Sequence, residues 1–328
     1  MTEETGDRAF ALWSVGAGRV EIRPASALPP DEGALRLRAL VTGISRGTES
    51  LVFQGRVPES EWHRMRCPFQ EGDFPFPVKY GYSMVGLVED GPVDLIGARV
   101  FCLHPHQTRA TIPVCAAVVV PTDIPTERAV LAAQMETALN ATWDAAPRIG
   151  DEIAVIGAGV IGCLVAFLCA GLPGTLVTLI DRDDSRRAVA ATLGVPFATT
   201  SERLPSGCDV VMHASGDGEG LDLALSLAGF EAAVTEISWY GSNTVRVSLG
   251  GAFHSQRLVL RSSQVGAVAP DRRARWNSRR RLALALRLCA DARLDALLGD
   301  ETPFERLPAA MPEILGRPSA LCHLVRYR

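Results

Sequence analysis

The stretch Ile153-Ala-Val-Ile-Gly157-Ala-Gly159-Val-Ile-Gly162 decides the fold that this sequence predicts. An apolar strand runs directly into the pattern G-x-G-x-x-G and then into an apolar helix. The first glycine allows a tight turn, the second lets a pyrophosphate approach the backbone, and the third lets the helix pack on the strand. The helix N-terminus would offer unpaired N–H groups to the phosphates. The predicted cofactor contacts are Gly157, Ala158, Gly159, Val160, Ile161 and Gly162.

A second predicted strand, Leu176–Ile180, ends at Asp181. A carboxylate there can accept hydrogen bonds from ribose hydroxyls and would repel a 2′-phosphate, so NAD is the expected cofactor. Arg182 and the arginines behind it keep NADP open. The turn Ala214-Ser215-Gly216 is expected to pass near the same cofactor, whereas His213 before it is interpreted as a structural histidine at a strand end.

The pattern changes near Pro121. Before this point, short β-type runs broken by Gly and Pro predict an antiparallel or barrel-like β domain. After it, strands and helices alternate with short connections, which is typical of a doubly wound parallel sheet. The expected strands are Ala34–Thr42, Met84–Val88, Ala98–Leu103, Val114–Val120, Ile153–Ile156, Leu176–Ile180, Asp209–Met212, Ala232–Ile237 and Leu321–Tyr327, and the expected helices are Thr126–Trp143 with Thr126 as N-cap, Val160–Ala170, Ser185–Leu193, Gly220–Leu227, Arg279–Asp291 and Phe304–Leu315.

Composition narrows the class of protein. The formal net charge is −4, so nothing at whole-chain level favours nucleic acid or an anionic membrane as a partner. The arginine-rich run 271–281 is interpreted as a solvated helix face or a subunit contact. Eight cysteines without a C-x-x-C pair, and an acidic start over Met1–Phe10 without an apolar core, predict a reduced, cytoplasmic protein.

The layout resembles the medium-chain dehydrogenase/reductase superfamily over nearly the whole chain. That resemblance implies an α/β architecture with two domains. Residues 1–121 and 292–328 would form a GroES-like catalytic domain, and residues 122–291 would form the Rossmann domain. It also implies a small-molecule substrate in the cleft between the domains and, by analogy alone, a homodimer.

Two further stretches carry the resemblance and also depart from it. Gly43-Ile-Ser45-Arg46-Gly-Thr48-Glu49 is similar to the element G-I-C-G-T-D, and Gly81-Tyr82-Ser83-Met-Val-Gly86 to G-H-E-x-x-G. In zinc-dependent members the first supplies a cysteine ligand and the second a histidine. Here Ser45 or Arg46 stands at the cysteine position and Tyr82 at the histidine position, and residues 132–134 hold no third ligand. No metal site, and so no zinc, is therefore expected.

Four other stretches resemble a bacterial subgroup that is commonly labelled zinc-binding alcohol dehydrogenases and is related to bacteriochlorophyllide dehydrogenases. They contain the two histidines His104 and His106, the run 135–140, the run Ser238-Trp-Tyr-Gly241 and the run Phe253-His254-Ser255. The resemblance does not imply a substrate.

Without a metal, other groups must stabilise negative charge on a substrate oxygen and move a proton. Tyr82 and Ser83 are candidate hydrogen-bond donors, and Thr48 stands where the resemblance implies a relay hydroxyl. Arg46 is either a cation near the reacting oxygen or a partner of Glu49. His104 or His106 is a candidate acid or base, with ordinary loop histidines as the alternative. Further candidate cleft residues are Ser45, Glu49, Glu136, Asn140 and His254, although Glu136 and Asn140 equally suit a helix-fixing role.

These features predict a zinc-independent, NAD(P)-dependent enzyme that transfers hydride between nicotinamide and an alcohol/carbonyl pair. One alternative is a quinone or enoyl reductase, which needs no strong carbonyl electrophile. Another is a dinucleotide-binding protein without turnover. Convergence of Arg46, Tyr82 and Ser83 would favour carbonyl chemistry, whereas an apolar surface there would favour quinone or enoyl reduction.

Overall fold

The computed structural model describes residues 8–27, 29–317 and 321–328. They form two compact units, each considered by itself below. The start of the chain, on which the expectation about an export signal depends, lies mostly outside the described residues. The first unit is Met1–Ala133, Leu286–Ala290 and Leu298–Arg328, and the second is Gln134–Ala285 and Asp291–Leu297.

The second unit contains a six-stranded, wholly parallel sheet in the order β12-β11-β10-β13-β14-β15. In chain order this is 3-2-1-4-5-6, the Rossmann arrangement, with its switch point between β10 and β13. The expected doubly wound domain is therefore confirmed. The strands are β10 (Glu152–Ile156), β11 (Leu176–Asp181), β12 (Phe197–Thr199), β13 (Cys208–His213), β14 (Ala228–Glu236) and β15 (Val259–Ser262).

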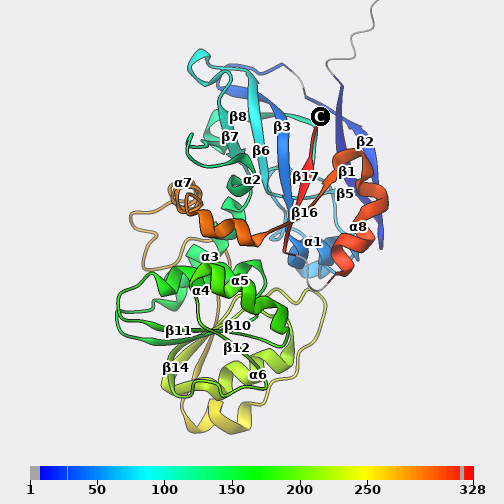
Figure 1. Ribbon diagram of the computed structural model, residues 1–328. Helices are drawn as coiled ribbons and strands as arrows, with labels where there is room; N and C mark the ends of the chain where they lie inside the picture. Colours follow the sequence, from blue (N-terminus) through cyan, green and yellow to red (C-terminus); the bar gives the residue numbers. More distant parts are fainter. Residues whose placement is uncertain (1–7, 28, 318–320) are drawn as a thin grey trace, which may run out of the picture. The chain divides into compact units, whose positions relative to one another are not determined.

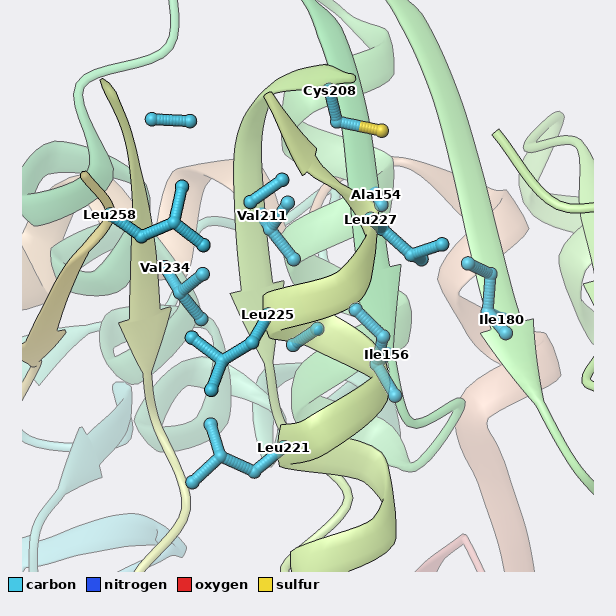
Figure 2. Packing of buried hydrophobic residues seen from close by; sticks show 13 residues of the cluster. Ala154, Ile156, Ile180, Cys208, Val211, Leu221, Leu225, Leu227, Val234 and Leu258 are labelled. Carbon is cyan, nitrogen blue, oxygen red and sulfur yellow. The ribbon is translucent and has the colours of Figure 1, made fainter. Parts of the chain in front are cut away.

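Helices cover both faces of this sheet. In Figure 1, α4 (Val160–Ala170) and α5 (Arg187–Leu193) lie on one face and α6 (Gly218–Leu227) on the other. Figure 2 shows Leu221 and Leu225 of α6 beside the buried Val211 and Val234 of the strands. Gly194 follows α5 as its C-cap and adopts the left-handed conformation that is typical of this position. The apolar run from residue 153 is thus a buried strand followed by a buried helix.

The expected helix over 126–143 is two helices. α2 (Thr126–Ala129) and α3 (Ala132–Ala145) are separate, and Thr126 is not the N-cap. Its hydroxyl instead accepts a hydrogen bond from the Arg99 guanidinium at 2.9 Å. Because α2 packs on a strand of the first unit, the units divide at residue 133 rather than at the expected 121.

The first unit is built from mainly antiparallel sheets, as expected for a β-rich domain. One has the order β2-β1-β5-β4, and the other β16-β17-β3-β6-β7-β9, with β8 also paired to β3. β17 pairs with β3, so the C-terminal strand completes a sheet begun near the N-terminus. The strands are β1 (Ala9–Gly16), β2 (Arg19–Ala25), β3 (Ala34–Ile44), β4 (Glu71–Gly72), β5 (Val78–Lys79), β6 (Met84–Asp90), β7 (Arg99–Cys102), β8 (Arg109–Pro113), β9 (Ala117–Val119), β16 (Leu298–Pro303) and β17 (Cys322–Arg326).

Three further α-helices lie within the described residues. They are α1 (Arg46–Phe53), α7 (Ser278–Leu288) and α8 (Leu307–Gly316). α8 packs with α1 and contributes Leu307 and Met311 to a core shared with Phe53 and Val325. Within residues 8–27, 29–317 and 321–328, every helix falls short of the length and apolarity needed to cross a bilayer.

Candidate functional site

The glycine-rich loop occupies the end of β10 at the switch point of the parallel sheet. Gly157 has φ +101°, and a Cβ there would lie 2.6 Å from the backbone nitrogen of Ser215. A Cβ on Gly162 would lie 1.7 Å from the carbonyl oxygen of Gly157. Only glycine fits at these two positions. At Gly159, the N-cap of α4, a Cβ would meet no atom within 4 Å, so the loop is open where the second glycine faces outward.

The remaining predicted cofactor contacts surround this open position. Ala158 is buried, whereas Val160 and Ile161 in the first turn of α4 are partly exposed. Asp181 ends β11, and its Oδ2 accepts a hydrogen bond from the Ala158 N–H at 2.6 Å. Its Oδ1 accepts from the Asp183 N–H at 2.9 Å. The carboxylate is therefore held against the loop where a dinucleotide would bind.

The arginines that follow Asp181 differ in how they are engaged. Arg187 donates hydrogen bonds to Asp184 and to both oxygens of Glu202, which leaves it tied to other carboxylates. Arg182 is exposed. The local charge thus combines one carboxylate at the loop with one exposed guanidinium beside it, and both NAD and NADP remain compatible with it.

The turn after β13 packs directly on the glycine-rich loop, as the 2.6 Å distance above indicates. Ser215 and Gly216 are exposed, and Ala214 is partly exposed. The Ser215 hydroxyl lies 2.5 Å from Nε2 of His213, whose side chain is buried. The predicted residues of this turn therefore lie beside the predicted cofactor loop.

In the first unit, the hydroxyl side chains of Tyr82, Ser45 and Thr48 form a cluster, called the hydroxyl cluster below. Ser45 and Thr48 lie near enough to the phenol of Tyr82 to lower its pKa. Burial raises the pKa of Tyr82 well above its ordinary value, and this effect exceeds the lowering by the two hydroxyls. Tyr82 is therefore a neutral phenol that can donate a hydrogen bond. The hydroxyl cluster thus consists of three of the predicted site residues.

A buried chain of polar side chains contacts the hydroxyl cluster at Ser45. Oε1 of Glu49 accepts the Ser45 N–H at 2.7 Å, and Oε2 lies 3.0 Å from Nε2 of His106. Nδ1 of His106 lies 2.6 Å from the Thr42 hydroxyl, which is 3.0 Å from the Tyr327 hydroxyl. Glu49, His106 and Thr42 are all buried. The chain thus connects α1, the loop after β7, β3 and the residue that follows β17.

Two small features surround this chain. Lys79 is buried and donates to Gln107 at 2.8 Å as well as to Glu71. A cavity of about 20 Å³ lies against Glu49 and His106, which is room for roughly one water molecule.

Three predicted catalytic residues belong neither to the hydroxyl cluster nor to the buried polar chain. Ser83 is buried and donates to the carbonyl of Val130 at 2.5 Å, and Arg46 donates to the carbonyl of Arg317 at 3.4 Å. Nδ1 of His104 lies 2.9 Å from the carbonyl oxygen of its neighbour, Pro105. Burial lowers the pKa of His104 to about 3, so its ring is neutral at ordinary pH.

Two of the predicted cleft residues in the second unit, Glu136 and Asn140, have structural partners. Arg281 bonds Oε1 of Glu136 at 3.0 Å and Oδ1 of Asn140 at 2.5 Å, and all three side chains are buried. This geometry matches the helix-fixing alternative. Burial raises the pKa of Glu136, and Arg281 opposes that shift. His254 is exposed.

Gln134 is a candidate that the sequence reasoning missed. It lies within residues 132–134, the stretch examined for a third zinc ligand. Its amide is buried, and within the described structure neither its oxygen nor its nitrogen has a hydrogen-bond partner. Buried polar groups nearly always have a partner, so this amide is a candidate ligand-binding group. The search for metal-binding residue types had hidden it.

The zinc-dependent pattern is not matched by the donors present. Zinc is held by thiolate, imidazole or carboxylate, whereas the corresponding positions carry the hydroxyls of Ser45 and Tyr82. In the described part of the chain, no three His, Cys, Asp or Glu side chains gather closely enough to bind a metal ion. These side chains do not fit a zinc ion.

Sequence comparison finds partial relatives. An aliphatic (R)-hydroxynitrile lyase from Linum usitatissimum is 25% identical over 143 residues, which cover 42% of this chain and 34% of the lyase. An L-threonine 3-dehydrogenase from Bacillus velezensis is 27% identical over 124 residues, covering 38% of this chain and 33% of that enzyme. The aligned part thus spans about a third of these relatives, and no family model matches.

Solved structures match over nearly the whole length. A zinc-binding dehydrogenase from Sinorhizobium meliloti bound to NADP has a TM-score of 0.73 and 17% identity, covering 97% of this chain and 99% of that one. A short-chain alcohol dehydrogenase from Escherichia coli complexed with NADH has a TM-score of 0.74 and 17% identity, covering 98% and 100%. The chain therefore shares the fold of these dehydrogenase structures. At these identities the likeness establishes the fold and leaves the chemistry to be argued from the side chains.

Proposed function

We propose that the protein is an NAD(P)-dependent oxidoreductase that transfers hydride between nicotinamide and an alcohol or carbonyl substrate without zinc. The observation that carries the proposal is the hydroxyl cluster of Tyr82, Ser45 and Thr48. The same chain also has an open glycine-rich loop at a Rossmann switch point. The partial likeness to a threonine dehydrogenase supports a CH–OH substrate.

The residues around the loop would hold the dinucleotide. Gly159 leaves room for the pyrophosphate, the N-terminus of α4 offers N–H groups to it, and Asp181 would accept from the ribose hydroxyls. When bound, the nicotinamide supplies the hydride-transfer chemistry. Asp181 favours NAD, and the exposed Arg182 leaves NADP as the alternative.

The hydroxyl cluster would bind the substrate oxygen through a hydrogen bond. The neutral Tyr82 phenol donates a hydrogen bond to a carbonyl, and Ser45 and Thr48 stabilise the phenol oxygen as its proton is drawn away. Glu49 holds the Ser45 backbone through its N–H, and His106 fixes Glu49 from the other side. Each buried partner thereby orients the groups that meet the substrate.

A substrate screen followed by nicotinamide absorbance tests this proposal. Alcohols and ketones should be turned over faster than quinones and enals, because the hydroxyl cluster is suited to binding a carbonyl oxygen. Tyr82→Phe should lower kcat/KM by about 100-fold, the size expected for loss of a general acid. Tyr80→Phe is the matched control, because Tyr80 packs edge-on against Tyr82 at a distance of 6.0 Å between the ring centroids but does not belong to the hydroxyl cluster.

Four outcomes would contradict it. Faster reduction of quinones would favour the reductase alternative, and dinucleotide binding without turnover would favour a non-catalytic protein. Cleavage of aliphatic cyanohydrins without a change in nicotinamide absorbance would favour lyase chemistry, as in the flax relative. Stoichiometric zinc in protein purified without added metal would overturn zinc independence. A homodimer is proposed from the fold, and light scattering in solution tests it.

A further inference from the structure

A hydrogen-bonded series in the second unit runs from a partly buried carboxylate to an exposed hydroxyl. His213 ends β13 and pairs in register with Glu236 at the end of β14. Nδ1 of His213 lies 2.7 Å from Oε2 of Glu236, and Nε2 lies 2.5 Å from the Ser215 hydroxyl. The His213 side chain is completely buried, whereas Ser215 is exposed. The imidazole therefore connects the two.

Glu236 is held as a charged acceptor. The Tyr240 hydroxyl donates to its Oε2 at 2.9 Å, and the Ser238 N–H donates to its Oε1 at 2.7 Å. Burial raises the pKa of Glu236, but the hydrogen bonds from His213 and Ser238 lower it by more, so the carboxyl is ionised. A carboxylate only accepts hydrogen bonds, so Nδ1 of His213 must carry the proton that faces it.

This protonation fixes the role of Ser215. With its proton on Nδ1, the uncharged form of His213 has a free lone pair on Nε2, to which the Ser215 hydroxyl can donate. The Asp217 N–H lies 3.4 Å from the same hydroxyl oxygen and donates to it. A hydroxyl whose own proton is already donated becomes a stronger acceptor on its remaining lone pair. Ser215 thus presents an acceptor to solvent.

The surrounding chain leaves room for this arrangement beside the cofactor loop. A Cβ on Gly220 would lie 2.3 Å from the Ser215 hydroxyl oxygen and 2.7 Å from Nε2 of His213, so only glycine admits the pair. On the other side, the Ser215 backbone lies against Gly157, the first glycine of the loop. The acceptor is therefore placed where a bound dinucleotide passes.

We propose that His213 and Glu236 are positioning residues that hold Ser215 as a hydrogen-bond acceptor for a hydroxyl group of the bound dinucleotide. The inference rests on the proposed function, because it requires dinucleotide binding at the glycine-rich loop. Ribose hydroxyls can donate to such an acceptor, whereas the oxygens of a phosphate cannot. The interaction therefore selects a ligand by its donors.

The test measures NADH binding by fluorescence titration of the full chain, with NADPH as the probe if wild type binds it more tightly. Ser215→Ala and Glu236→Gln should each raise Kd about 3- to 10-fold, the loss expected for one hydrogen bond. Because Glu236 acts through Ser215, the double variant should bind like Ser215→Ala alone. Ser226→Ala is the matched control, since this exposed serine donates only to the Leu223 carbonyl in its own helix.

The double-variant comparison separates positioning from a merely structural role. If Glu236→Gln weakens binding further in the Ser215→Ala background, Glu236 does not act through Ser215 and the inference is overturned. Unchanged NADH binding by Ser215→Ala overturns it as well, while leaving the proposed function intact. If wild type binds neither NADH nor NADPH, both proposals are overturned together.

Discussion

Replacing Glu49 should destabilise the first unit by a predictable amount. The carboxylate is buried and accepts the Ser45 N–H at 2.7 Å, and its other oxygen pairs with Nε2 of His106 at 3.0 Å. Glu49→Ala leaves both of these groups without a partner. Each orphaned buried group costs about 1–3 kcal/mol, which gives about 2–6 kcal/mol in total. A whole domain has only about 5–15 kcal/mol of stability.

Glu49→Gln separates the hydrogen bonds from the side-chain volume. The amide oxygen can still accept from the Ser45 N–H, and the amide nitrogen can donate to His106 if its ring carries the proton on Nδ1. We expect a loss of about 1 kcal/mol. The matched control is Glu61→Ala, which removes an exposed pair with Arg64 and should cost less than about 1 kcal/mol.

Urea unfolding followed by circular dichroism measures all three variants at a common slope. The reasoning is refuted if Glu49→Ala loses less than about 1 kcal/mol, or if Glu49→Gln loses as much as Glu49→Ala. Either result would mean that the groups left behind find other partners.

Three further predictions follow from the same structure. Gly159→Ala should leave the melting temperature unchanged but weaken NADH binding at least about 10-fold in a fluorescence titration, because the new methyl occupies open space at the loop. Gly157→Ala should instead lower the melting temperature, because Gly157 has a φ of +101° and lies close to Ser215. Equal melting temperatures for the two variants would contradict this. Gln134→Leu should stabilise the fold by about 1–2 kcal/mol in urea unfolding, since an orphaned buried amide is removed, and should lower kcat/KM; a destabilised variant would show that the amide already has partners. The pKa of His104 falls from an ordinary 6.5 to about 3, so between these pH values the unfolded chain binds a proton that the folded chain does not. The stability should therefore fall as the pH falls from 6.5, by up to about 1.4 kcal/mol per pH unit. His104→Gln should flatten this slope in a pH series of urea midpoints, and an unchanged slope would mean that other groups cause the pH dependence.

The sequence predicted the fold where the signal is local. The G-x-G-x-x-G turn, the carboxylate at Asp181 and the alternation of strands and helices each depend on neighbouring residues, and the sheet order then follows from known topology. β15 was missed because all four of its residues are exposed, so it carries no burial pattern. The two helices within 126–145 were merged because apolar spacing does not register a break of two residues.

The candidate site was harder because it depends on direction and on long-range pairing. The sequence predicts that Tyr82 and Ser83 both face the substrate, but the Ser83 hydroxyl instead bonds the carbonyl of Val130, 47 residues away in sequence. The sequence predicts a structural histidine at His213, and the structure shows it buried with partners; its partner Glu236, however, lies 23 residues away, and only the parallel pairing of β13 and β14 joins them. No spacing rule reveals such a pair.

The pairing of β17 with β3 has a consequence for synthesis. The ribosome releases β3 long before its partner strand, and Tyr327 then bonds Thr42 across 285 positions. The second unit lies almost wholly within one continuous stretch, residues 134–285, so it can fold before β16 and β17 join the first unit. Until β17 emerges, β3 has an open edge that could pair with another chain and aggregate. Emergence of β17 thus marks the point at which this edge of β3 becomes protected.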